Sequence, residues 1–474
     1  MSEPSARKDS SDQDSENIEL VSLYKKREKI YTRSYRGFFR NIRIGGAAFL
    51  LILYFGVAWI SVDGQQILLF DLPARQFHVF GATFYPQDLV LLSCLLIICA
   101  FGLFFITVLA GRVWCGYACP QTVFTWLYMW AERITEGDRN QRMRLDKAEM
   151  SPARFFRKAF KHVLWLAIAM ATGITFVGYF TPVRELVPDL LSLSVDPWAL
   201  FWISFFTLAT YGNAGWLREQ VCIYMCPYAR FQSVMYDQNT ATIWYDPVRG
   251  EPRGPRKKST VPETRGLGDC INCMMCVHVC PTGIDIRDGL QYECIGCAAC
   301  VDACDSIMDK MGYDRGLIRY STESEIVEGK PGKILRPRLI GYFLALIIVM
   351  AIFLVIVSSR SMIELEILRD RQSLYIEAAD GLIENVYTLR LLNKDQQAHH
   401  YRITVSGLDG LRYEGDKTVE VASGELLNIP VRLAASRQAL KGRRNTAIVF
   451  TATAGTASIP PVSAESRFLA PAPR

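Results

Sequence analysis

The stretch that determines the fold runs from residue 270 to residue 304 and reads CINCMMCVHVCPTGIDIRDGLQYECIGCAACVDAC. It contains two four-cysteine runs, Cys270-x-x-Cys273-x-x-Cys276-x-x-x-Cys280 and Cys294-x-x-Cys297-x-x-Cys300-x-x-x-Cys304. This spacing is typical of bacterial ferredoxins with two 4Fe–4S clusters, in which the fourth thiolate of each run binds the cluster of the other run. Zinc sites use pairs of Cys-x-x-Cys rather than two complete runs. The stretch therefore predicts a two-cluster ferredoxin domain with its core over residues 265–310.

The crossing of the fourth thiolates divides these cysteines into two ligand sets. The first cluster set comprises Cys270, Cys273, Cys276 and Cys304. The second cluster set comprises Cys280, Cys294, Cys297 and Cys300. The first run ends in Cys280-Pro281, as such runs do, whereas the second ends in Cys304-Asp305 without losing a ligand.

The chain on either side of this stretch is strongly apolar. Of its 474 residues, 50% are hydrophobic and 21% are charged. The apolar residues form five runs: Ile44–Val62, Leu89–Ala110, Val163–Phe180, Trp198–Tyr211 and Leu339–Val357. A bilayer core requires about 20 helical residues, and the fourth run is shorter than that. The alternative interpretation of this run is a re-entrant or interfacial helix. The sequence thus predicts a multi-domain membrane protein with an α-helical bundle of about five spans. A net charge of +6 is too small for nucleic-acid binding driven by bulk charge.

Lysine and arginine residues in the connections predict the orientation of the spans. Ten precede the first run, one separates the first and second, ten follow the second, one follows the third and sixteen follow the fourth. This alternation predicts a cytoplasmic, disordered and basic N-terminus over residues 1–40 and a four-span bundle over residues 41–218. Residues 219–336, with the ferredoxin domain, are then cytoplasmic, where disulfides are disfavoured. Residues 337–358 form the fifth transmembrane helix.

The tail over residues 373–474 has the pattern of a different kind of domain. Four segments alternate apolar and polar residues: Val386–Leu392, Tyr401–Val405, Thr418–Ala422 and Ala447–Ala452. Alternation of this kind is typical of half-buried strands. About 100 residues of short strands predict an immunoglobulin-like β-sandwich, which the orientation places in the periplasm.

The remaining cysteines include a repeated motif at the ends of the second and fourth apolar runs. The first copy is Cys115-Gly-Tyr-Ala-Cys119-Pro120, and the second, which runs to residue 227, is Cys222-Ile-Tyr-Met-Cys226-Pro227. The two copies lie 107 residues apart, and the predicted topology places both at the cytoplasmic face. We refer to them as the first and second membrane motifs.

Cysteines four residues apart lie on one face of a helix. Such a pair of thiolates suits a soft ion such as Cu(I), and the two pairs together suit a four-sulfur site. Reversible dithiol–disulfide chemistry and plain buried packing are the alternatives. The duplication with identical spacing favours metal or redox chemistry, because packing alone does not require it. Cys94 and Cys99 lack this spacing and are interpreted as apolar residues of the second span.

In the order of its spans, motifs, ferredoxin runs and exported sandwich, the chain resembles the FixG/CcoG/RdxA family of cytochrome oxidase accessory proteins. The resemblance extends from about Arg33 to the C-terminal sandwich, and Asp305 is the one departure noted. It implies a bacterial inner-membrane protein that is needed to assemble cbb3-type cytochrome c oxidase. It further implies a cupric reductase that delivers Cu(I), with two 4Fe–4S clusters as cofactors and with a copper chaperone or oxidase assembly factors as partners.

On this hypothesis a cytoplasmic donor reduces the clusters, and electrons pass to copper held by Cys115, Cys119, Cys222 and Cys226. The sequence leaves undecided whether two chains form a homodimer that shares a copper site. Two other functions also stay open. One is a quinol dehydrogenase or polyferredoxin electron-transfer module, although the exported sandwich is unexpected there. The other is a non-redox assembly scaffold with structural clusters.

Overall fold

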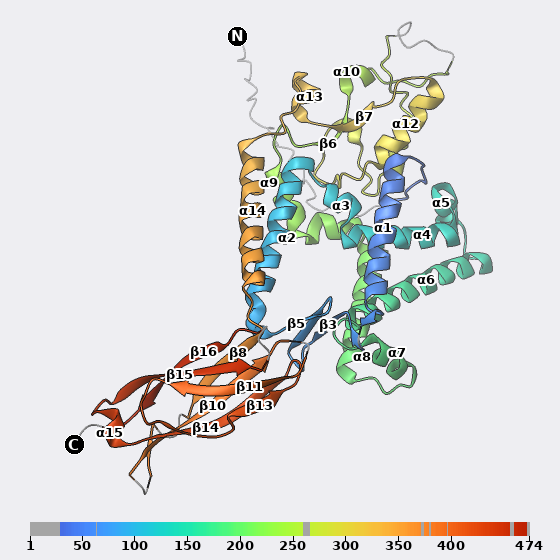
Figure 1. The fold of residues 1–474 in the computed structure, drawn as a ribbon. Helices are drawn as coiled ribbons and strands as arrows, with labels where there is room; N and C mark the ends of the chain where they lie inside the picture. Colours follow the sequence, from blue (N-terminus) through green and yellow to red (C-terminus); the bar gives the residue numbers. More distant parts are fainter. Residues whose placement is uncertain are drawn as a thin grey trace, which may run out of the picture.

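The structure is a computed structural model, and it describes residues 29–62, 64–258, 266–370, 374–378, 381–395, 397–455 and 459–471. Most of the expected disordered N-terminus falls in residues 1–28, outside these ranges, as does residue 373, the expected start of the sandwich. Figure 1 shows a helical bundle with the ferredoxin region at one end and a β-sandwich at the other.

Four described helices are long and apolar enough to cross a membrane. They are α1 (Phe38–Val57), α2 (Leu89–Ala110, preceded by a 3-10 turn from Pro86), α6 (Pro152–Val177) and α14 (Pro337–Ser358). α2 and α14 lie side by side in Figure 1, and their contact is aromatic. The ring of Tyr342 lies 6.1 Å from that of Phe104 and 6.5 Å from that of Phe101.

The fourth apolar run forms a shorter helix with an unusual end. α8 (Pro197–Thr210) has 14 residues and continues as a π-helical segment, η2 (Tyr211–Leu217). α8 packs closely on α6 because α6 has a glycine at the crossing. A Cβ at Gly173 would lie 2.7 Å from Thr207 Oγ1 and 2.8 Å from the Ile203 carbonyl oxygen. α8 is shorter than the about 20 residues of a straight span, and the π-helical segment supplies its continuation.

Several smaller elements connect these helices. The α1–α2 connection holds β1 (Ser61–Val62) paired with β2 (Gln65–Gln66), and a second sheet of β3 (Leu68–Asp71), β4 (Gln76–Val79) and β5 (Ala82–Phe84). The other helices of the bundle region are α3 (Val113–Tyr117), α4 (Pro120–Glu136), α5 (Arg139–Lys147) and α7 (Val183–Leu191). None of these elements shows the long apolar pattern from which the spans were predicted.

The ferredoxin region repeats one local geometry twice. α11 (Met275–Val279) lies within the first cysteine run, and α12 (Ala299–Met311) begins within the second. The second cysteine of each run is flanked by two left-handed residues, Asn272 and Met274 in the first run and Gly296 and Ala298 in the second. Three of the four are not glycine, and non-glycine residues adopt this conformation mainly where the surrounding structure requires it. The two cysteine loops are therefore copies of one fold.

The rest of this region surrounds the cysteine loops. It consists of η3 (Val221–Met225), α9 (Pro227–Met235), β6 (Thr242–Tyr245), α10 (Pro247–Gly250), β7 (Ile318–Ser321) and α13 (Glu323–Glu328). β6 and β7 form an antiparallel pair with Thr242 opposite Ser321. Ile243 and Ile318 of this pair are buried against the loops, so the pair covers the cysteines on one side.

An aspartate of α12 caps the first membrane helix. The two carboxylate oxygens of Asp302 accept hydrogen bonds from the backbone N–H groups of Phe39 at 3.1 Å and Arg40 at 2.7 Å. These amides belong to the first turn of α1, where helical N–H groups have no partner within the helix. The carboxylate also opposes the positive end of the helix dipole. Asp302 thus attaches the ferredoxin region to the first span.

We expect Asp302→Ala to lower the free energy of unfolding by about 1–2 kcal/mol, because it removes a helix cap. The measurement is chemical denaturation of the full-length protein, followed by the loss of cluster absorption. Asp309→Ala on the same helix is the control, since Asp309 pairs with Arg315 at an exposed position and its loss should change stability by less than about 0.5 kcal/mol. Equal effects of the two variants would contradict the capping role.

The C-terminal domain is a sandwich of two antiparallel sheets. One has the order β12-β14-β10-β8, with β9 paired to β10, and the other has the order β13-β11-β15-β16. The strands are β8 (Ile363–Arg369), β9 (Ile376–Glu377), β10 (Ile383–Asn393), β11 (His399–Ser406), β12 (Arg412–Glu414), β13 (Thr418–Val421), β14 (Leu426–Ala435), β15 (Asn445–Ala454) and β16 (Val462–Leu469), with the short helix α15 (Arg437–Leu440) before β15. The four predicted strands lie in β10, β11, β13 and β15.

Aromatic residues join the two sheets. Tyr387 and Phe450 are fully buried with ring centroids 5.4 Å apart, and the Tyr387 hydroxyl donates to the Arg467 carbonyl oxygen at 3.0 Å. The domain begins earlier than the sequence indicates, since β8 starts at Ile363, directly after α14. The sandwich is therefore held close to the membrane helix.

Candidate metal centres

The first cluster set surrounds a single cavity. Cys270, Cys273, Cys276 and Cys304 all line it, together with apolar side chains that include Tyr245, Met308 and Ile318. Cys273 is exposed, whereas Cys270 and Cys276 are buried. This cavity therefore has one cysteine at the surface of the ferredoxin region.

The second cluster set surrounds the adjoining cavity. Cys280, Cys294, Cys297 and Cys300 line it, and Cys276 borders it as well. Because Cys276 borders both cavities, the two lie next to each other. Isoleucines at positions 243, 286 and 295 line the second cavity, so its walls are apolar.

Both cavities fit a cluster better than a single ion. Among the described residues, no three His, Cys, Asp or Glu side chains converge closely enough to hold one metal ion. Four thiols spread around a cavity are what a cubane requires, because each binds a different iron. Left-handed residues also flank the second cysteine of each run, and backbone turns of this kind favour anionic groups and recur at iron–sulfur sites. The cysteines present therefore fit two 4Fe–4S clusters.

The first membrane motif packs directly on the loop of the second cluster set. Gly116 follows Cys115 in α3, and a Cβ at this position would lie 2.9 Å from both Cys297 Cα and the Ile295 carbonyl oxygen. Cys115 is half-buried against the apolar cluster that contains Ile295 and Cys297. Only glycine permits this close approach, so the motif and the cluster loop touch through their backbones.

Arg112 connects the same elements. Its guanidinium donates to the carbonyl oxygens of Tyr292, just before the second cysteine run, and of Ala229 in α9. Its guanidinium carbon also lies 4.7 Å from the centre of the Tyr292 ring. Arg112 is buried, which is costly for a charge unless it is well hydrogen-bonded. It therefore links the first motif, the cluster loop and the helix that follows the second motif.

The second membrane motif reaches the same loop from another side. Residues Val221–Met225 form the π-helical segment η3, and Pro227 starts α9 directly after Cys226. Cys222 lines a small cavity together with Pro281, Thr282 and Ile295. These three residues flank the ligands of the second cluster set. Both membrane motifs therefore meet the second cluster set rather than the first.

The four cysteines of the two motifs lie close enough to influence one another. The pKa of the Cys115 thiol is raised to about 12, chiefly by burial and in smaller part by the neighbouring Cys119, Cys222 and Cys226, while Arg112 opposes the shift. Burial likewise raises the pKa of the Cys222 thiol to about 11, with Cys119 and Cys226 contributing. The Cys115 thiol lies 3.4 Å from Gln232 Oε1. The structure thus gathers the two motifs at one place.

The tyrosines of the two motifs differ in their surroundings, although they occupy the same place in the repeat. The hydroxyls of Tyr117 and Tyr320 lie 3.4 Å apart, and Tyr320 donates to the Gly296 carbonyl oxygen at 2.6 Å. Tyr224 is 58% exposed. Tyr117 is therefore connected to the second cluster loop, while Tyr224 lies at the surface.

Sequence reasoning did not identify Arg112, Gly116 or Tyr320 as residues of the site. The signal for the first two was their position, since Arg112 precedes the first motif and Gly116 lies inside it. Tyr320 is distant in sequence from every cysteine motif, and it carries no signal of this kind.

We expect Gly116→Ala to lower the free energy of unfolding by about 1–3 kcal/mol, because the added methyl group would overlap the backbone of the cluster loop. The measurement is thermal unfolding of the full-length protein, with electron paramagnetic resonance (EPR) of the reduced clusters to detect a shift of that loop. Gly102→Ala in α2 is the matched control, since its Cβ would meet nothing within 4 Å. A Gly116 variant as stable as the control would show that the motif and the loop are not in contact.

Three domain families match the chain. A 4Fe–4S dicluster domain matches residues 217–323, which contain both cluster sets and the second membrane motif. A 4Fe–4S binding domain matches residues 92–135, around the first motif. The immunoglobulin-like fold at the C-terminus of FixG matches residues 353–471. These matches agree with the predicted ferredoxin domain and sandwich.

Whole-chain relatives extend this agreement. The nitrogen fixation protein FixG of Rhizobium meliloti (strain 1021) is 36% identical over 84% of this chain and 83% of its own length. RdxB of Cereibacter sphaeroides is 40% identical over 83% of this chain and 85% of its own length. RdxA of the same organism is 38% identical over 86% of this chain and 87% of its own length. The chain belongs to the FixG/RdxA family. As a FixG/RdxA protein with apolar spans and a matched dicluster domain, it is a membrane-bound iron–sulfur electron-transfer protein.

The solved structure of another protein is similar to one part of this FixG/RdxA protein. The crystal structure of a FixG-related protein from Vibrio parahaemolyticus matches 23% of this chain and 97% of that chain, with 33% sequence identity and a TM-score of 0.22.

Proposed function

We propose that this FixG/RdxA protein is a cupric reductase of the bacterial inner membrane, which converts Cu(II) to Cu(I) for the assembly of cbb3-type cytochrome c oxidase. The ferredoxin region lies in the cytoplasm in this proposal, and the sandwich lies in the periplasm. A cytoplasmic protein donates the electrons, and a copper chaperone or an oxidase assembly factor receives the Cu(I).

The observation that carries the proposal is the contact between the first membrane motif and the loop of the second cluster set at Gly116. It brings the thiols of the membrane motifs next to ligands of an iron–sulfur cluster. When bound, the clusters supply electrons one at a time, and conversion of Cu(II) to Cu(I) takes one electron. The second cluster set is thus the one nearest to the copper, and the first set, with its exposed Cys273, is the one nearest to an incoming donor.

The membrane motifs supply the binding chemistry for copper as substrate. Thiolates are soft ligands that favour Cu(I) over harder ions. Cys115, Cys119, Cys222 and Cys226 lie near one another, although among the described residues no three such side chains converge on one ion site. Tyr117 adds a hydrogen-bonded link from the first motif through Tyr320 to the cluster loop.

The test is an anaerobic titration of the reduced, desalted protein with Cu(II). The cluster absorption is followed together with a Cu(I)-specific chelator. Cluster reoxidation in step with Cu(I) formation is the expected result. Clusters that stay reduced with Cu(II) but are oxidised by a quinone would contradict the proposal and favour a quinol dehydrogenase.

A further inference from the structure

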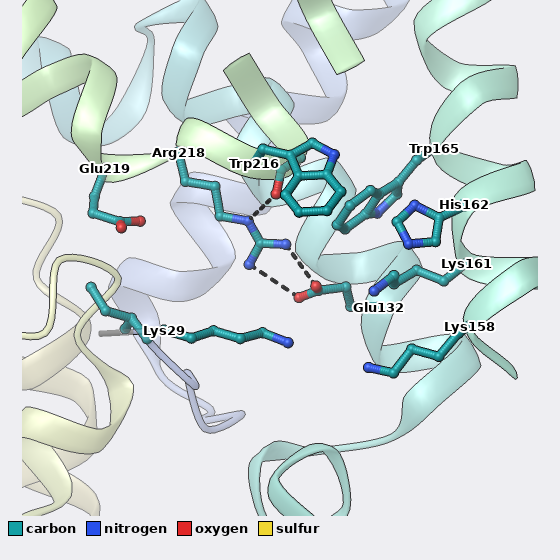
Figure 2. A pocket seen from close by; sticks show the side chains of 11 residues that line it. Lys29, Glu132, Lys158, Lys161, His162, Trp165, Trp216, Arg218 and Glu219 are labelled. Atoms are coloured by element: carbon teal, nitrogen blue, oxygen red, sulfur yellow. Dashed lines mark hydrogen bonds and ion pairs between the residues drawn. The ribbon is translucent and has the colours of Figure 1, made fainter. Parts of the chain in front are cut away.

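A separate cavity lies near the ferredoxin end of the bundle and is not used by the proposed function. It lies among α4, α6 and η2, beside the chain segment that holds Lys29, and has a volume of about 950 Å³ with its open mouth included. Figure 2 shows Lys29, Lys158 and Lys161 reaching toward the same space, below Arg218 and an aromatic group. The cavity therefore combines a cationic floor with an aromatic wall.

The cations in and around this cavity share their carboxylates. Lys29 and Lys158 both pair with Asp146, Lys158 and Lys161 both pair with Glu136, and Arg142 and Arg218 both pair with Glu132. Five cationic side chains thus share three carboxylates. Four of these cations line the cavity, namely Lys29, Lys158, Lys161 and Arg218, and the carboxylates that line it are Glu132 and Glu219. Since an ammonium carries three donors, sharing leaves hydrogen-bonding capacity and positive charge for a further anion.

Burial makes that charge effective. Lys161 is 5% exposed, and its ammonium lies 4.7 Å from the centre of the Trp165 ring. A charge held away from water interacts more strongly with an incoming anion than a surface charge does. An anion between the lysines would therefore be held by several donors at once.

The wall beside the lysines is aromatic and extends to the surface. The ring of His162 lies 6.1 Å from that of Trp216 in a stacked arrangement, and 5.2 Å from that of Trp165. Trp216 is 57% exposed, and α6 also exposes Phe155 and Phe156 near its start. Aromatic and basic residues together are typical of the polar boundary of a bilayer, and basic pockets between spans bind anionic lipid headgroups.

We propose that this cavity binds a phosphate-bearing anion, namely the headgroup of an anionic phospholipid, with the phosphate between Lys29, Lys158 and Lys161. Trp165, Trp216 and His162 contact the less polar part of the lipid. Inorganic phosphate offers the same anionic chemistry without acyl chains. The site has a route to the membrane motifs, because Arg218 and Glu219 also line the cavity of Cys222.

Native mass spectrometry of the full-length, cluster-loaded protein in detergent tests this site. Three probes are compared: dioctanoyl phosphatidylglycerol, the zwitterionic dioctanoyl phosphatidylcholine, and inorganic phosphate as a competitor. Lys158→Gln is the informative variant, because Lys29 still pairs with Asp146 and Lys161 still pairs with Glu136. We expect it to weaken phosphatidylglycerol binding at least about tenfold, since a charge-assisted hydrogen bond is lost. Unchanged cluster absorption shows that the variant is folded.

Two further variants complete the design. Lys158→Arg keeps the charge and should restore binding, whereas Lys310→Gln removes an exposed lysine on α12 and should leave binding unchanged. Binding of phosphatidylglycerol that inorganic phosphate does not displace identifies a lipid site, and displacement at equal concentration identifies a site for free phosphate. Equal binding of the two lipids, or equal binding by the Lys158→Gln and Lys310→Gln variants, would overturn the proposal.

Discussion

Replacing Cys115 and Cys222 together by serine is expected to slow Cu(II) reduction by on the order of 100-fold while the cluster absorption stays at full strength. The reason is that each change removes a soft ligand from one membrane motif, and loss of even an indirect partner of a metal ligand weakens binding by about 10–100-fold. The variants leave the eight cysteines of the cluster sets unchanged. The measurement is anaerobic stopped-flow mixing of reduced protein with Cu(II) and a Cu(I)-specific chelator.

Cys94→Ser and Cys99→Ser together form the matched control, because these cysteines lie in α2 and outside both motifs. The control should reduce Cu(II) at the rate of the unaltered protein. Iron analysis adds a second measurement. If the Cys115 and Cys222 variant loses iron as well as copper reduction, separate roles for motifs and cluster sets are wrong.

Replacing Cys304 by serine is expected to remove the same EPR signal as replacing Cys270, although Cys304 is in the other cysteine run. The reason is that both line the cavity of the first cluster set. By the same argument Cys280→Ser should behave like Cys294→Ser, since these two line the second cavity. Each single variant should keep about four of about eight irons, because a 4Fe–4S cluster requires its full set of thiolates.

EPR of the dithionite-reduced variants, together with iron and sulfide analysis, distinguishes the two assignments. Sequential ligation within each run predicts the opposite pairing, in which Cys304→Ser resembles Cys294→Ser. That result would show that the fourth thiolates do not cross.

The sequence predicts this fold well wherever a local pattern carries the information. Hydropathy predicted the four long spans, and alternation predicted strands that lie in β10, β11, β13 and β15. The cysteine spacing predicted the ferredoxin region that the matched dicluster domain supports. In each case a residue and its near neighbours determine the element, so no distant contact has to be known.

The parts that were not predicted depend on contacts between distant segments. The end of the fourth apolar run is π-helical from Tyr211, and periodicity of 3.6 residues does not describe such a segment. The contact of Gly116 with Cys297 joins residues far apart in the chain, and a single glycine within a motif does not reveal its partner. The charge-sharing cavity at Lys158 likewise draws on α4, α6 and the segment before α1, which no local pattern brings together.

The cap of α1 has a consequence for how the chain is made. Asp302 accepts hydrogen bonds from the backbone amides of Phe39 and Arg40, although it lies 263 residues after the first and 262 residues after the second. Because translation proceeds from the N-terminus, the first helix emerges from the ribosome long before its capping carboxylate exists. The backbone N–H groups in the first turn of α1 lack this partner until the second cysteine run has been synthesised and α12 has folded. The first helix is therefore completed only late in biogenesis, at the stage when the ferredoxin region takes its final shape.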